Sequence, residues 1–170
     1  MDVTPSSATT TAVFNAGEIR ASVRTGAQVL FLSEATLDDG GAAAVYRIIG
    51  DEAFFRGHFK DNPVMPASVM LEALGLLGLL AAAAATSGGA GDAGGERSAR
   101  LAEASGRLRV TAVDGVRCHR VCRPGEVLTL TLKKTSAEAG RTVFAGSVRV
   151  GTEKAVSLEA MTVAGVVSGG

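Results

Sequence analysis

The sequence predicts an α+β fold in which one antiparallel sheet packs against a single long helix. Residues 66–85 (PASVMLEALGLLGLLAAAAA) are good helix formers and are apolar nearly all the way round. Most of the remaining chain consists of short apolar runs separated by Gly, Asp and Pro, a pattern typical of antiparallel strands joined by turns. Because a helix that is apolar on every side needs cover all round, we expect the sheet to curl about it.

The length and composition fit one folded domain. The chain has 170 residues, 46% of them hydrophobic and 20% charged, with a formal net charge of zero. Balanced charge argues against a general nucleic-acid binder. The start of the chain is rich in Ser, Thr and Ala and lacks the features of a secretory signal. We therefore expect a disordered tail over residues 1–15 and one domain over residues 16–167.

The first elements are expected to be a short helix over residues 17–26 and then a hairpin. Two apolar, partly alternating runs, 28–37 and 42–49, are separated by an Asp-Asp-Gly-Gly cluster at residues 38–41. Such a cluster between two strand-like runs is typical of a tight antiparallel turn.

The second half of the chain is expected to be strands only. The long helix ends at Thr86-Ser87-Gly88-Gly89, and the low-complexity residues 88–95 form a flexible connector. Turn residues at regular spacing then divide five strand-like runs, at residues 107–113, 116–122, 127–133, 142–150 and 155–163.

The twenty apolar residues of the long helix are also long enough for a membrane span. Glu72 lies in the first half of this helix, and a carboxylate in the middle of a bilayer costs at least about 2.5 kcal/mol. The helix also has two internal glycines and no basic flank directly after it. We therefore favour a core helix and expect no membrane span.

The two cysteines, Cys118 and Cys122, predict neither a metal site nor a disulfide. A metal site needs more ligands than one i, i+4 pair, and on a strand the two thiols would lie too far apart to bond. We expect reduced thiols in a cytoplasmic protein.

Charge is distributed unevenly along the chain. Residues 1–96 carry five basic and eleven acidic side chains, whereas residues 97–150 carry eleven basic and four acidic ones. A basic half without interleaved aromatic residues suits an acidic protein partner or a phosphorylated ligand. A solvated strand face explains the same pattern, so both interpretations stay open.

Residues 54–74 (FFRGHFKDNPVMPASVMLEAL) hold the candidate catalytic groups. His58 lies among three phenylalanines, where desolvation keeps an imidazole neutral and able to accept a proton. Glu72 lies about six residues inside the apolar helix, where burial would raise its pKa and make it a general acid. The free N–H groups around residues 67–69, at the helix entry, would stabilise an enolate oxygen. These features alone indicate an acid–base enzyme or a ligand pocket.

The motif FFRGHF followed by NPVMP, with Glu72 fourteen residues after His58, resembles the β-hydroxyacyl-acyl-carrier-protein dehydratases. Weaker similarity extends over residues 17–163, including EIR at 18–20 and VRCHRVCRPGE at 116–126. The resemblance implies the hot-dog fold, an antiparallel sheet wrapped around one long central helix. It also implies a homodimer or a higher oligomer of dimers, and no cofactor or metal.

The resemblance implies a role for each candidate residue in dehydrating a (3R)-3-hydroxyacyl-acyl carrier protein to the trans-2-enoyl thioester. His58 would take the C2 proton and Glu72 would protonate the departing 3-hydroxyl, the two usually coming from different subunits. Arg120 and Arg123 are the candidates for binding the carrier protein and its phosphopantetheine arm. The candidate substrate-binding residues are Gly57, Phe59, Val64, Pro66, Ala67, Ser68 and Leu76.

The sequence departs from the family pattern near the site. Ala67 replaces a usual Gly, Leu76 replaces a usual Gln, and Lys60-Asp61 replaces a common Pro-Gly. These departures suggest a specialised pathway, such as polyketide or secondary lipid assembly, and a reduced or altered activity, while fatty acid biosynthesis stays open as well. Two alternatives remain: a non-catalytic hot-dog subunit that binds acyl carrier protein, and a hot-dog thioesterase in which Glu72 activates water.

Overall fold

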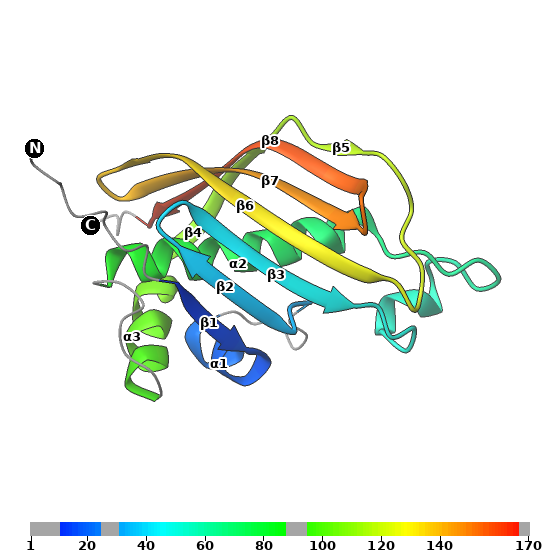
Figure 1. Ribbon diagram of the computed structural model, residues 1–170, viewed down its shortest axis with the longest axis horizontal. Coiled ribbons are helices and arrows are strands. Elements are labelled where there is room, and N and C mark those ends of the chain that lie inside the picture. The colour runs from blue at the N-terminus through cyan, green and yellow to red at the C-terminus, as the bar shows by residue number, and fades with distance from the viewer. Residues whose placement is uncertain (1–10, 25–30, 88–94, 167–170) are drawn as a thin grey trace, which may run out of the picture.

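An eight-stranded antiparallel sheet wraps around the long helix α2 in the computed structural model of the protein (Figure 1). The structure describes residues 11–24, 31–87 and 95–166. The strands are β1 (Ala12–Asn15), β2 (Glu34–Asp38), β3 (Gly41–Arg47), β4 (Leu108–Asp114), β5 (Arg117–Cys118), β6 (Val127–Glu138), β7 (Arg141–Val150) and β8 (Glu153–Gly165). The helices are α1 (Ala16–Ser22), the 3-10 helix η1 (Ala53–Arg56), α2 (Ala67–Thr86) and α3 (Gly95–Gly106).

The order of the strands confirms the predicted hot-dog fold. The sheet runs β1-β2-β3-β6-β7-β8-β4, with β5 paired to β8 off this path. The predicted hairpin is β2 and β3, which pair in register up to Asp38 opposite Gly41. The sheet therefore has β1 at one edge and β4 at the other.

Helix α2 forms the centre of the core. Leu74, Leu77 and Leu80 are fully buried, and 61% of an 18-residue apolar stretch of the helix is buried within the fold. Length and composition would allow this helix to cross a membrane, but that degree of burial is what a core helix shows. A Cβ atom at Gly78 would lie 2.5 Å from the Met161 methyl group, so the glycine lets β8 approach the helix closely.

The strand residues alternate between the core and solvent, as a sheet covered on one face requires. On β6, Leu128, Leu130 and Leu132 are buried against the core, while Thr129 and Thr131 between them are exposed. One face of the sheet therefore packs against α2 and the other is polar.

The expected tail over residues 1–15 is wrong at its end, because residues 12–15 form β1. Ala12 and Phe14 are buried, and β1 pairs with β2. Asn15 then caps α1 by accepting from the Glu18 N–H, while the Glu18 carboxylate accepts from the Asn15 N–H. Residues 1–10 lie outside the described residues.

Helix α3 was not predicted, since only strands were expected after the connector. Its sequence is polar, and the helix is held by contacts that its own pattern does not reveal. The buried Arg97 pairs with Glu18 at 2.8 Å, and its guanidinium lies 4.2 Å from the centre of the Phe14 ring. These contacts attach α3 to α1 and β1.

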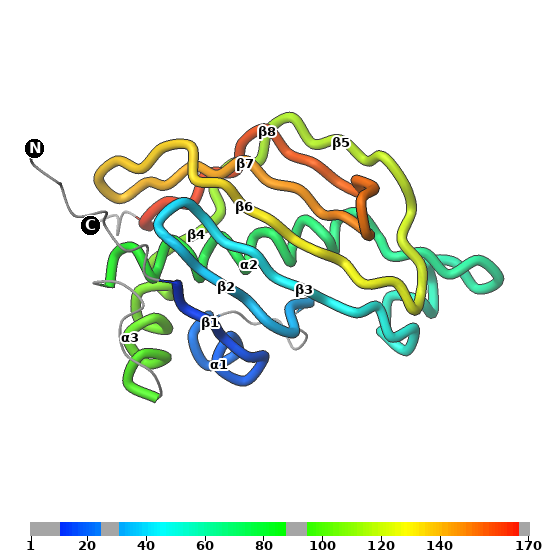
Figure 2. Tube along the Cα trace, viewed as in Figure 1, coloured from blue at the N-terminus to red at the C-terminus, as the bar shows by residue number. Residues whose placement is uncertain are grey.

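The strand expected over residues 116–122 is also largely wrong, because only residues 117–118 pair with β8. The chain that follows leaves the sheet and comes to lie beside the segment that precedes α2 (Figure 2). Met65 and Cys122 form an isolated antiparallel bridge there. This contact joins the two loops at one end of the sheet.

Candidate active site

His58 lies in the loop between η1 and α2, and its ring is fixed from both sides. The ring Nδ1 lies 3.1 Å from the Val64 carbonyl oxygen, and the Val64 N–H donates to the His58 carbonyl at 3.0 Å. Because a carbonyl only accepts, Nδ1 must carry a hydrogen, so in the neutral imidazole the lone pair lies on Nε2. Phe59 stacks on the imidazole at 4.4 Å between ring centres.

The loop that carries His58 is tied to the loop before β6. The Met65 N–H donates to the Cys122 carbonyl at 2.8 Å, and the Arg123 guanidinium donates to the Asn62 side chain. Arg120 forms ion pairs with two carboxylates, Glu126 at 2.6 Å and Glu153 at 3.3 Å. Both candidate carrier-binding arginines thus make contacts within their own chain.

The two cysteines are expected to differ sharply in reactivity. Burial raises the pKa of the Cys122 thiol to about 11, and the side chain is fully buried, whereas Cys118 is exposed. Because the thiolate is the reactive species, iodoacetamide should alkylate Cys118 and leave Cys122 unmodified in the folded protein. Peptide mass spectrometry before and after unfolding checks this, and modification of native Cys122 would contradict it.

Glu52 anchors the approach to η1, a role that no pattern in the sequence indicates. Its carboxylate accepts from the Tyr46 hydroxyl at 2.7 Å and from the N–H groups of Ile49 and Gly50 at 2.8 and 2.6 Å. Burial alone would raise the pKa of Glu52, but these hydrogen bonds outweigh it and lower the pKa. Burial, together with the hydrogen bond to this carboxylate, raises the pKa of Tyr46.

A lowered folded-state pKa means that ionised Glu52 stabilises the fold above its unfolded pKa of about 4.3. This contribution is lost as the pH falls through the folded-state value. Replacing Glu52 by Gln should cost about 1–3 kcal/mol of unfolding free energy near pH 7, and the cost should shrink as the pH drops below 4. Thermal melts of Glu52→Gln and wild type from pH 7 to pH 3 check this. The exposed neighbour provides a matched control, Asp51→Asn, and an equal loss in that variant would contradict the prediction.

Glu72 lines a cavity of about 600 Å³ between α2 and β4. Ser68 and Leu76 line the same cavity. Its remaining lining residues are Arg24, Leu71, Gly75, Leu79, Leu108, Arg109, Val110, Val113 and Met161.

The expectation that Glu72 is buried is wrong for the single chain, in which the side chain is exposed. The reason is that β4 is the last strand of the sheet, so the part of the chain that the structure describes gives this side of the helix no further cover.

The start of α2 offers fewer free donors than expected. Pro66 precedes the helix without a side-chain cap, and the Val69 N–H donates to the Pro66 carbonyl at 3.1 Å. Among residues 67–69, the N–H groups of Ala67 and Ser68 therefore remain as candidate donors, at the positive end of the helix dipole.

The structure places the predicted site residues in two groups. Ser68, Glu72 and Leu76 share the cavity, with Pro66 and Ala67 just before them at the helix entry. The other group is the loop with His58, in which Gly57 and Phe59 are exposed and Val64 is buried; none of these residues lines the cavity within one chain. A single chain therefore presents the predicted base, His58, and the predicted acid, Glu72, in separate places.

The fold and these side chains define a hot-dog protein with a carboxyl group beside a largely apolar cavity and an imidazole in a separate loop. A family model described as the FabA-like domain matches residues 28–159. The chain belongs to this dehydratase family.

Curated relatives agree with this assignment. The chain is 31% identical over 121 residues to the 3-hydroxyacyl-[acyl-carrier-protein] dehydratase FabZ of Thermoanaerobacter sp. (strain X514), a match that covers 71% of this chain and 74% of the relative. It is 31% identical over 128 residues to FabZ of Coxiella burnetii (strain RSA 331 / Henzerling II), covering 75% and 81%. The enzyme class that the motif predicted is confirmed.

Solved structures support the fold. The dehydratase heterocomplex ApeI:P from Xenorhabdus doucetiae superposes with a TM-score of 0.61 at 10% identity, covering 88% of this chain and 91% of that one. The conserved protein PA5202 from Pseudomonas aeruginosa superposes with a TM-score of 0.58 at 15% identity, covering 86% and 98%. At such identities the likeness shows the hot-dog fold alone.

Proposed function

We propose that the protein removes water from a 3-hydroxyacyl thioester carried on an acyl carrier protein. The observation that carries the proposal is the state of His58, whose Nδ1 is held by the Val64 carbonyl so that Nε2 is free to accept a proton. Glu72 supplies a carboxyl group beside a largely apolar cavity that suits an acyl chain.

The reaction follows from these groups. His58 Nε2 takes a proton from C2 of the substrate, and the N–H groups of Ala67 and Ser68 stabilise the negative charge that develops on the thioester oxygen. The C3–O bond then breaks, and protonated Glu72 donates to the departing hydroxyl, which leaves as water. The product is the 2-enoyl thioester. The proton gained by His58 returns to Glu72 before the next turnover.

The active unit in this proposal is a homodimer. The edge strand β4 lies next to the cavity that holds Glu72, and Val113 and Val116 near its end are exposed apolar residues. An unpaired edge strand readily adds a strand from another chain. A second copy at this edge would cover Glu72 and bring its own His58 to the cavity, which unites the base and the acid.

The partner in this proposal is a cytoplasmic acyl carrier protein. Arg123 is exposed beside the loop of His58 and keeps part of its guanidinium free after contacting Asn62.

The departures at Ala67 and Leu76 point to a specialised substrate in polyketide or secondary lipid assembly.

The test is to incubate the purified protein with 3-hydroxyacyl thioesters of short and long chain length, on a carrier protein and on a small thiol. The expected product is the 2-enoyl thioester, detected by mass loss of one water. Release of free acid and thiol without enoyl product would instead indicate a thioesterase. A stable complex with carrier protein and no turnover would indicate a non-catalytic subunit.

A further inference from the structure

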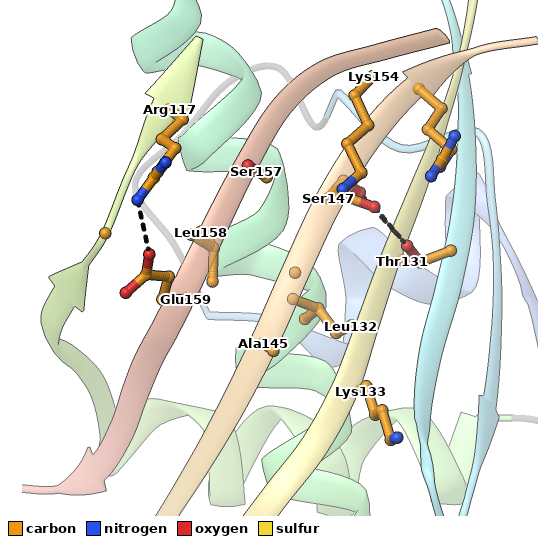
Figure 3. Close-up of a pocket in the computed structure, with 13 residues that line it drawn as sticks. Arg117, Thr131, Leu132, Lys133, Ala145, Ser147, Lys154, Ser157, Leu158 and Glu159 are labelled. Atoms are coloured by element: carbon orange, nitrogen blue, oxygen red, sulfur yellow. Dashed lines mark hydrogen bonds and ion pairs between the residues drawn. The ribbon is translucent and has the colours of Figure 1, made fainter. Parts of the chain in front are cut away.

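The outer face of the sheet, opposite α2, carries a cationic depression that the proposed reaction does not use (Figure 3). Its volume is about 500 Å³, and it lies over β5, β6, β7 and β8. Four cationic side chains line it against one carboxylate, namely Arg117, Lys133, Arg149 and Lys154 against Glu159. None of the predicted catalytic or substrate-binding residues lines it.

Two of these cations lie directly opposite each other. Arg149 on β7 and Lys154 on β8 are cross-strand partners, and both line the depression. Like charges in directly opposed positions of an antiparallel pair destabilise a sheet. Arg149 uses Nη1 to donate to the Thr152 carbonyl at 2.6 Å, which satisfies a donor but leaves the charge uncompensated.

The nearby carboxylates are already paired with other cations. Glu159 pairs with Arg117 at 3.2 Å, and Glu153, which is adjacent to Lys154, pairs with Arg120 at 3.3 Å. Within residues 11–24, 31–87 and 95–166, Lys133, Arg149 and Lys154 form no ion pair. The depression therefore has an excess of positive charge that the chain itself does not neutralise.

A row of hydroxyl groups crosses the depression next to this pair. Thr131, Ser147 and Ser157 are register partners on β6, β7 and β8. This row lies about 7 Å along the strands from the row that holds Arg149, since Ser147 and Arg149 are two residues apart. Thr131 and Ser147 are joined by a hydrogen bond of 3.0 Å (Figure 3). Hydroxyls both donate and accept, so the row suits a polar ligand.

The size of the depression indicates the kind of ligand it would take. Gly146 on β7, in register with Leu132 on β6 and Leu158 on β8, lies at the floor of the depression. The volume of about 500 Å³ is in the range of small-molecule sites, which favours a small ligand over the broad surface of a partner protein.

We propose that this depression binds a small phosphorylated ligand, with a phosphate group between Arg149 and Lys154 and other polar groups along the hydroxyl row. A phosphate offers two negative charges and several acceptor oxygens, so it relieves the repulsion between the two cations and accepts from both. Lys133, on the far side of the hydroxyl row, adds to the attraction. This site lies on the opposite face of the sheet from Glu72, so the proposal is independent of the dehydratase reaction.

Isothermal titration with inorganic pyrophosphate tests the proposal on the full-length protein. We expect saturable binding at one site per chain, and Lys154→Gln should weaken it at least about tenfold, since charge-assisted hydrogen bonds are lost. The matched control is Lys134→Gln, which removes the same charge from β6 outside the depression and should change the affinity less than about twofold. Absence of saturable binding, or equal weakening in both variants, would overturn the proposal.

Thermal melts without ligand give a second, independent readout. Because Lys154 faces Arg149, Lys154→Gln should raise the Tm of the free protein, while it abolishes most of the increase in Tm that pyrophosphate produces in wild type. Lys134→Gln should leave that pyrophosphate-induced increase in place. If Lys154→Gln lowers the Tm of the free protein, the cation pair is not under repulsion and the proposal fails.

Discussion

Replacing His58 by alanine should lower kcat for 3-hydroxyacyl thioester dehydration by about 10²–10⁴-fold, the range expected for losing a general base. Because Nδ1 of this imidazole is bonded to the Val64 carbonyl, Nε2 is the ring nitrogen that is left to accept a proton. The measurement is the rate of enoyl formation at saturating substrate, with the Tm as a check on folding.

The chain supplies its own control for this experiment. It has two histidines, and the second, His119, is exposed and bonds the Ser157 hydroxyl through Nε2 at 2.8 Å. His119→Ala should keep the wild-type rate. Unchanged dehydration in His58→Ala, or an equal loss in His119→Ala, would show that His58 is not the base.

Replacing Glu72 by glutamine should lower kcat by a similar factor of about 10²–10⁴, because an amide cannot protonate the leaving hydroxyl. The Tm of the variant checks that it folds. A folded Glu72→Gln dimer with wild-type turnover would eliminate Glu72 as the acid.

Mixing the two inactive variants tests whether the site is shared between subunits. If each site takes His58 from one chain and Glu72 from the other, a mixed dimer of His58→Ala and Glu72→Gln has one intact site. If the two variants are mixed in equal amounts and exchange subunits at random, about half of the dimers are mixed. Each mixed dimer has one of its two sites intact, so about a quarter of the wild-type activity should return. Activity that stays at the level of the separate variants after proven subunit exchange would place both groups in one chain.

The sequence determined the architecture because the pattern of apolar residues is local. The all-round apolar run at residues 66–85 required a covering sheet, and it became α2 with bounds one residue away at each end. The Asp-Gly cluster at residues 38–41 set the hairpin of β2 and β3. The motif around His58 and Glu72 identified the enzyme class, since its residue types and spacing are visible without any coordinates.

Only the tertiary structure decided what depends on contacts between distant residues. Helix α3 is held by the contacts of Arg97 with Phe14 and Glu18, some eighty residues away, so its polar sequence carried no sign of them. The exposure of Glu72 follows from the position of β4 at the edge of the sheet, which no local pattern encodes. The opposition of Arg149 and Lys154 likewise depends on strand register. Composition and periodicity fix which elements form and which faces are apolar, whereas long-range packing fixes which side chains meet.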